Sequence, residues 1–187
     1  FRDLNQPLHW RQQQKISGRN ILAMGILHEA TVRWTPHPTQ VFAQTNIFQP
    51  QRLASPVTNA TAVDVPDSVQ IVTQLENGGR GLYHLSGIAL FGPGMQIHLF
   101  GSQGTIKYVF GETERLLIGS AGDKELREAE IPAEKKGGWR VEAEFIGSIR
   151  GEETVRFTNF PSGVRYMEFT EAVTRSADTN QPVTLPL

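Results

Sequence analysis

The 187 residues, of which 39% are hydrophobic and 20% charged, have the composition of an ordinary globular protein with a real core. The formal net charge of −1 provides no basic field, so we expect neither nucleic acid nor an acidic membrane as a partner. The absence of cysteine excludes disulfides, thiolate metal sites and cysteine nucleophiles. With no signal peptide and no apolar run of about 20 residues, the sequence predicts a cytoplasmic protein. Because the sequence starts at Phe1 rather than Met, we expect a processed product or an excised piece of a longer chain, and we favour the second.

The first predicted helix follows a polar, Gln-rich segment at residues 1–18. Asn20 is a plausible N-cap, and apolar residues then fall on all sides up to Trp34, which is typical of a buried helix. Gly25 lowers the helix propensity by about 1 kcal/mol, so we expect it to permit close packing. Pro36 ends the helix.

The middle of the chain switches to the period-two alternation of β-strands. A strand is predicted over 41–48, followed by a long loop over 49–68 and a second strand over 69–76. The dipeptide Asn77-Gly78 predicts a hairpin turn after that strand. Further strand-like runs cover residues 80–91, 95–101, 104–110, 114–119 and 125–131. Their short Gly-rich connections require antiparallel pairing, because a parallel connection needs a crossover.

Two more helices are predicted near the end of the chain. The first runs from Trp139 to Ile149, with Val141, Phe145 and Ile149 on one face. The second runs from Gly163 to Ala177. Its inward residues are Val164, Met167, Val173 and Ala177, and its outward residues are Glu168, Glu171 and Arg175. The order of helix, many strands and helices predicts a single α+β domain over 1–187, with an open, mainly antiparallel sheet and helices packed on one face.

The motifs of several common enzyme classes are missing. No G-x-G-x-x-G or G-x-x-x-x-G-K-[ST] occurs, so the glycines at 78–81 and 92–94 are interpreted as turns. The five histidines form no H-x-x-x-H or H-E-x-x-H pair, so we predict no metal site. No G-x-S-x-G motif marks a hydrolase serine.

The polar segment before the first helix is a candidate binding wall. Arg11, Lys15 and Arg19 place cations close to Trp10, and such groups bind carboxylates, phosphates and sugar hydroxyls. An exposed Trp face also suits the apolar face of a sugar ring. The alternative is a solvated N-terminal arm.

Polar residues inside the first helix also need an explanation, because burying them unpaired costs free energy. His28 has the pKa range of an acid/base catalyst, and the alternative is a hydrogen-bonded core histidine. Glu29 and Arg33 have the i, i+4 spacing of a structural ion pair.

Several motifs together make the chain resemble a known family. In chain order they are Trp10-Arg11, Ser17-Gly18, Gly25 with Trp34, residues 100–106, Glu144-Phe145, Ser148-Ile149-Arg150, residues 166–169, 171–173, Ser176-Ala177 and residues 183–186. In this order and spacing they resemble the C-terminal domain of the glucose–fructose oxidoreductase and inositol dehydrogenase family, called Gfo/Idh/MocA.

The resemblance implies a two-domain NAD(P)-dependent oxidoreductase of sugars or polyols. An N-terminal Rossmann domain would bind NAD or NADP, so we expect no cofactor in this fragment and no turnover by it alone. The C-terminal domain, with a fold like that of the C-terminal domain of glyceraldehyde-3-phosphate dehydrogenase, would form the substrate site. We expect His28 to be catalytic. The predicted substrate-binding residues are Trp10, Arg11, Lys15, Arg19 and Asn20.

The outer sheet face of such domains commonly makes the subunit contact, so we expect a homo-oligomer through a sheet face. The residues themselves also support this expectation, because apolar side chains alternate on both faces of the later strands. These residues are Met95, Ile97 and Leu99 against Phe100, Tyr108 and Phe110.

One departure from the family pattern bears on catalysis. The usual helix reads roughly D-x-G-x-H-x-x-D, and aligning its glycine on Gly25 puts Ala23, Leu27 and Ala30 at the three polar positions. His28 comes one residue late, about 100° around the helix. Either the chain belongs to a divergent dehydrogenase or it is a non-catalytic ligand-binding or scaffolding relative. A third interpretation is a free-standing carbohydrate-binding module.

Overall fold

An antiparallel sheet with the strand order β10-β1-β4-β5 forms the framework of the first part of the structure. β1 (Pro38–Asn46) lies between β10 (Val183–Thr184) and β4 (Ser68–Leu75), and β5 (Arg80–Ser86) pairs with β4. The Asn77-Gly78 hairpin that the sequence predicts is confirmed, because the two strands pair on either side of it.

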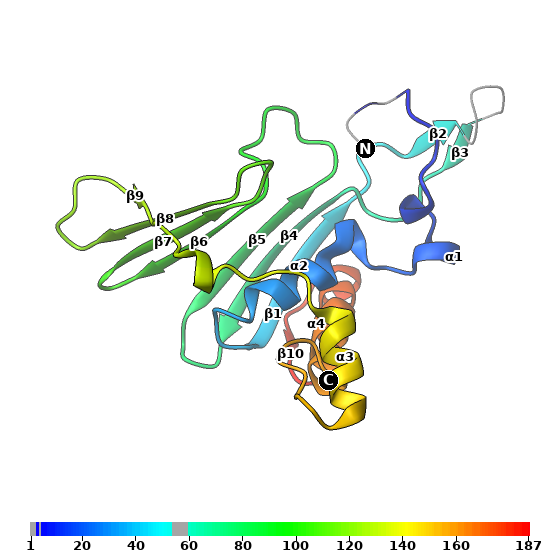
Figure 1. Cartoon of the computed structure of the whole chain (residues 1–187). Coiled ribbons are helices and arrows are strands. Elements are labelled where there is room, and N and C mark those ends of the chain that lie inside the picture. The colour runs from blue at the N-terminus through cyan, green and yellow to red at the C-terminus, as the bar shows by residue number, and fades with distance from the viewer. Residues whose placement is uncertain (1–2, 4, 54–59) are drawn as a thin grey trace. The chain divides into compact units, whose positions relative to one another are not determined.

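The computed structural model describes residues 3, 5–53 and 60–187. Their contacts group into two compact units, one formed by Phe1–Leu90 with Val155–Leu187 and the other by Phe91–Thr154. The first unit therefore contains both ends of the chain, and the second is inserted between them (Figure 1).

The core of the first unit lies between this sheet and two helices. α4 (Phe160–Thr179) packs against β1, and α2 (Met24–Thr31) packs against α4 (Figure 1). Alternate strand residues face the helices, as the period of a strand requires. The fully buried side chains that meet here include Val41, Ala43, Val69 and Ile71 from the sheet and Phe169, Ala172 and Val173 from α4.

The other face of the sheet carries an apolar row that is partly exposed. The register places Phe42 beside Val72 and Val72 beside Leu82, and the Leu82 side chain is 78% exposed. Glutamines flank this row along β1 and β4, namely Gln40, Gln44, Gln70 and Gln74.

The first helix is shorter than predicted. The chain forms short turns at η1 (Trp10–Gln12), α1 (Gln14–Ser17) and η2 (Ile21–Ala23) before α2 begins. Leu22 and Ala23 have φ values of 51° and 58°, so the backbone is left-handed immediately before α2. A left-handed conformation costs about 1–2 kcal/mol for a residue other than glycine. No local sequence pattern predicts it here.

The predicted loop at 49–68 is partly wrong, because β2 (Gln51–Leu53) and β3 (Ala60–Ala62) pair within it. Residues 54–59 of that segment lie outside the described residues. Arg52 on β2 is 3% exposed and donates hydrogen bonds to the carbonyls of Asp3 and Gln6, which ties the N-terminal segment to this ladder.

The second unit has its own antiparallel sheet in the order β6-β7-β8-β9. Its strands are β6 (Gln96–Gly101), β7 (Gly104–Val109), β8 (Arg115–Ser120) and β9 (Arg127–Glu128). η3 (Ala133–Lys135) and α3 (Val141–Arg150) follow.

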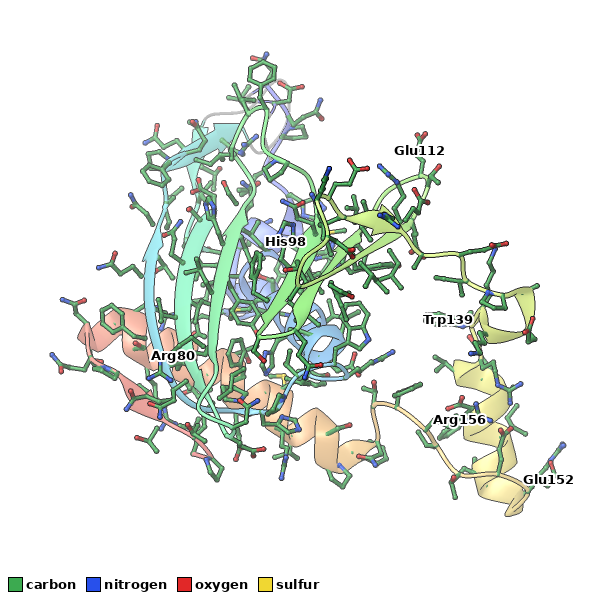
Figure 2. All side chains as sticks on the ribbon, turned by 90° about the vertical axis from the view of Figure 1, so that its left-hand side faces the viewer. Arg80, His98, Glu112, Trp139, Glu152 and Arg156 are labelled. Atoms are coloured by element: carbon green, nitrogen blue, oxygen red, sulfur yellow. The ribbon has the colours of Figure 1, made fainter. Side chains whose placement is uncertain are left out.

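The apolar face predicted for α3 is exposed to solvent. Val141, Phe145 and Ile149 are 58%, 58% and 71% exposed, and the only buried residue of α3 is Gly147. Trp139, just before the helix, is also largely exposed (Figure 2). Helical spacing identified an apolar face here but not what would cover it.

α4 is longer than predicted, and its inward face is displaced. Val164 and Met167 are more than half exposed, whereas Val173 is fully buried as predicted. The buried residues of α4 all fall within 169–176, because only this part of the helix faces the core cluster. The α+β class, with antiparallel sheets and helices on one face, is confirmed. No helix among the described residues is long and apolar enough to cross a membrane.

Candidate functional site

A polar pocket of about 200 Å³ lies where the end of α2 meets the segment that leads into α4. His28, Glu29 and Arg33 line it from α2 and the turn after it, and Thr158 lines it from the segment before α4. Arg156 lies on the same segment (Figure 2). A larger, open groove of about 600 Å³ on α4 is mainly apolar, so the smaller pocket is the better candidate for chemistry.

His28 lies both in the core and beside the pocket. It is 2% exposed and lies flat on Phe169, with 3.5 Å between ring centroids, and its Nδ1 is 3.0 Å from the Tyr83 hydroxyl. It is thus a hydrogen-bonded core histidine that also lines the pocket. Burial, with a smaller contribution from nearby His37, lowers the pKa of His28 to about 3, so the ring is neutral at pH 7. Burial also raises the pKa of Tyr83.

Glu29 and Arg33 form the ion pair that their spacing predicts. Arg33 Nη2 donates to both carboxylate oxygens, at 2.8 and 2.9 Å, and Nε donates to Oε1 at 3.0 Å. The Thr158 hydroxyl donates to the same Oε1 at 2.5 Å, and the guanidinium lies over the Phe157 ring. Thr158 has φ of 53°, so a β-branched residue is held in a strained conformation at the pocket wall.

Three residues of the predicted substrate wall lie on η1 and α1, which do not line the pocket. Trp10 is 46% exposed, and the Arg11 guanidinium lies over its ring at 4.1 Å from the centroid. Lys15 is exposed on α1. None of these three side chains lines the polar pocket.

The remaining wall residues have structural partners. Arg19 forms a two-pronged ion pair with Asp178, and the Asn20 side chain accepts a hydrogen bond from the Gly25 amide at 3.1 Å. Asp178 lies about 18 Å along α4 from Tyr166, the last α4 residue of the pocket, at about 1.5 Å per residue. The structure therefore does not bring Arg19 to this pocket.

The sequence missed Tyr83 and Thr158 as site residues. Tyr83 carries a usable signal, because it alternates with Leu85 on the inward side of a predicted strand. Thr158 carries none, because its contact with Glu29 joins residues that are 129 positions apart.

The described residues offer little that would hold a metal ion or a nucleotide. Within the described parts of the chain, no group of three or more His, Asp or Glu side chains could hold a metal ion. Gly78 and Gly94 have left-handed φ values in connections between strands. Among the described residues, no G-x-G-x-x-G loop joins a strand to a helix, which is the connection that holds a dinucleotide in a Rossmann domain.

A comparison with known families decides the chain's relationship. A family model described as the GFO/IDH/MocA C-terminal domain matches residues 1–107. The chain belongs to this family. None of the curated proteins matches it.

Solved structures share the fold of this GFO/IDH/MocA domain. A levoglucosan dehydrogenase in complex with NADH and L-sorbose has a TM-score of 0.82 and 22% identity, over 99% of this chain and 55% of that one. An oxidoreductase domain protein from Kribbella flavida has a TM-score of 0.80 and 16% identity, over 100% and 56% of the two chains. An aldose-aldose oxidoreductase from Caulobacter crescentus complexed with glycerol has a TM-score of 0.72 and 16% identity, over 96% and 52%. The chain thus spans about half the length of these proteins.

Proposed function

We propose that this chain is the substrate-binding and oligomerisation domain of an NAD(P)-dependent oxidoreductase that acts on a sugar or polyol. The pocket at the end of α2 carries the proposal. There a carboxylate, a guanidinium and a threonine hydroxyl converge beside a neutral histidine, and such groups suit the hydroxyls of a small polyol. Relatives of the same fold with L-sorbose or glycerol named in their complexes support this substrate class.

NAD or NADP would bind mainly to an N-terminal domain outside this sequence. The proposal therefore assigns the nucleotide no residue of this chain. His28 is the residue that we propose to touch the substrate, and Glu29 and Arg33 hold the shape of the pocket through their ion pair. The exposed pair of Trp10 and Arg11 would contact a longer sugar outside the pocket.

The test is reduction of NAD⁺ or NADP⁺ by the full-length protein across a panel that includes levoglucosan, L-sorbose, glycerol and inositols. We expect turnover with at least one of them and a loss of at least about 10² in rate for His28→Ala, because the variant removes a positioned polar group. The control is Trp139→Ala, which removes an exposed side chain of the second unit. Absence of turnover with every member of the panel would contradict the proposal.

A non-catalytic ligand-binding or scaffolding relative is the second candidate. It is favoured by Ala23, Leu27 and Ala30 at the three positions that are polar in the family pattern. The coding sequence upstream of this segment discriminates between the two. A G-x-G-x-x-G after a strand together with a Glu-Lys-Pro motif favours the dehydrogenase, and the absence of both favours the inactive relative.

The oligomerisation role is assigned to a sheet face. The row of half-buried Phe42 with exposed Val72 and Leu82 supports this assignment, because the face of an antiparallel sheet opposite its helices is usually polar where it meets water. The cytoplasmic location stays a prediction from the sequence.

A further inference from the structure

The hydrogen bond between His28 and Tyr83 can form in two ways. Either the Tyr83 hydroxyl donates to Nδ1, or a protonated Nδ1 donates to the Tyr83 oxygen, and the 3.0 Å separation fits both. The choice decides which nitrogen of His28 carries the proton, because a neutral imidazole has one N–H.

The surroundings of Tyr83 distinguish these arrangements. Apart from His28, its ring contacts Phe169, and no other described residue accepts a hydrogen bond from its hydroxyl. If Nδ1 were the donor, the proton of the partly buried Tyr83 hydroxyl would have no acceptor among the described residues. A donor without a partner in a largely desolvated position costs free energy, so the arrangement in which Tyr83 donates is favoured.

The second ring nitrogen of His28 faces a different environment. Nε2 has no hydrogen-bond partner among the described residues. It is also not one of the fully buried atoms that lack a partner, so it retains some contact with solvent. Since Nδ1 faces Tyr83 and His28 lines the pocket, Nε2 is the ring nitrogen left to face it. Phe169 holds the ring plane through the parallel stack, and the hydrogen bond with Tyr83 fixes which edge of the ring carries Nδ1.

We propose that Tyr83 is a positioning residue that holds His28 in the neutral Nε2–H form, so that the histidine presents a hydrogen-bond donor, and no proton acceptor, to whatever occupies the pocket. The assignment of the proton depends only on this chain. Its consequence for a substrate rests on the function proposed above. There, His28 would donate to an oxygen of the sugar or polyol and would not remove its hydroxyl proton.

The groups around His28 are consistent with a ring that keeps one proton. Glu29 and Arg33 from α2 neutralise each other, and His37, Arg156 and Tyr166 line the pocket from the segment before β1, the segment before α4 and α4 itself. The carboxylate of Glu29 is held by Arg33 and Thr158, and His28 has no hydrogen bond to any described carboxylate that would favour an imidazolium.

The direct test is NMR of the chain with ¹⁵N-labelled histidine rings. Two-bond proton–nitrogen correlations show which nitrogen is protonated, and His28→Gln identifies the resonances of His28 by their loss. We expect a protonated Nε2 and a bare Nδ1, unchanged between about pH 5 and 8. A protonated Nδ1, a mixture of both forms, or titration of this ring within that range would overturn the proposal.

Tyr83→Phe tests whether the hydroxyl sets this state, with Tyr108→Phe in the second unit as the matched control. Without the hydroxyl, the second form should appear and both nitrogen resonances of His28 should move, while the control leaves them in place. Unchanged resonances in folded Tyr83→Phe would remove Tyr83 from its role. If this variant does not fold, the spectrum of the unaltered chain still decides the protonated nitrogen. All of these measurements are made without ligand, so a failure of the sugar proposal would be seen separately.

Discussion

The imidazole of His28 lies within 7° of parallel to the ring of Phe169, and both side chains are buried. Phe169, a core residue of α4, therefore packs directly against a residue of the candidate site. Phe160, on the same helix, is 91% exposed and provides an internal comparison.

Phe169→Ala should lower the free energy of unfolding by about 3–5 kcal/mol, because it removes a fully buried ring and leaves a cavity beside His28. Phe160→Ala should change it by less than about 0.5 kcal/mol. Urea unfolding followed by circular dichroism measures both. Similar losses for the two variants would contradict the packing described here.

The ion pair of Glu29 with Arg33 can be compared with a second i, i+4 pair, Glu171 with Arg175. The Glu29 side chain is 11% exposed and also accepts from Thr158, whereas the Glu171 and Arg175 side chains are 51% and 55% exposed. Glu29→Gln should cost about 1–3 kcal/mol of unfolding free energy, since it weakens charge-assisted bonds in a partly buried site. Glu171→Gln should cost about 0.5 kcal/mol or less. Equal losses in urea unfolding would mean that the pocket pair is no stronger than a surface pair.

Gly25 and Gly163 should respond in opposite directions to replacement by alanine. A Cβ at Gly25 would lie 3.3 Å from both Thr170 Cγ2 and Tyr166 Cδ2, whereas one at Gly163 would approach only Tyr166, at 3.9 Å. Gly163→Ala should raise the free energy of unfolding by about 0.5–1 kcal/mol, because alanine has the higher helix propensity. Gly25→Ala should destabilise by about 1 kcal/mol, because crowding outweighs the same gain. Thermal unfolding measures both, and stabilisation by Gly25→Ala would show that α2 can move away from α4.

The depressed pKa of His28 predicts how stability depends on pH. Its unfolded-state pKa is about 6.5 and its folded-state pKa is about 3, so the unfolded chain binds the extra proton between these values. The neutral buried ring therefore makes the protein less stable as pH falls from about 6.5 towards 3, by up to about 1.4 kcal/mol per pH unit. In His28→Gln this contribution disappears, so unfolding free energies measured at several pH values should fall less steeply on acidification. Parallel curves for the two proteins would refute the assignment.

The outer sheet face is tested by Leu82→Glu. If copies of the chain associate through Phe42, Val72 and Leu82, a charge in the row should shift the mass measured by light scattering at micromolar concentration towards that of the monomer. Val164→Glu places the same charge at an exposed position of α4 and should leave the mass unchanged. A monomeric mass for the unaltered chain would contradict association through this face.

Local signals accounted for most of the strands but less of the helices. The alternation along 69–76 and the Asn77-Gly78 turn determine a hairpin with few other contacts, so both were predictable. The left-handed pair at Leu22 and Ala23 was not, since no sequence pattern identifies such a backbone and the Asn20 side chain bonds to Gly25 only in the folded state.

The candidate site was predicted only where its contacts are local. Glu29 and Arg33 are one helical turn apart, so spacing alone identified their pair. The contact of Tyr83 with His28 spans 55 positions and that of Thr158 with Glu29 spans 129, and both depend on tertiary packing. Arg19 illustrates the converse, because a cation chosen from composition is paired with Asp178 far along α4.

The two ends of the chain share one core, and this has a consequence for synthesis on the ribosome. Val41 and Ile71 are made early, but Phe169 and Val173, which complete their cluster, follow only after the whole of the second unit. The apolar face of the first sheet would therefore stay partly exposed while the inserted segment is translated. Contacts between such distant parts of a chain also form slowly. Truncation before α4 should therefore yield aggregation-prone protein rather than a smaller stable domain.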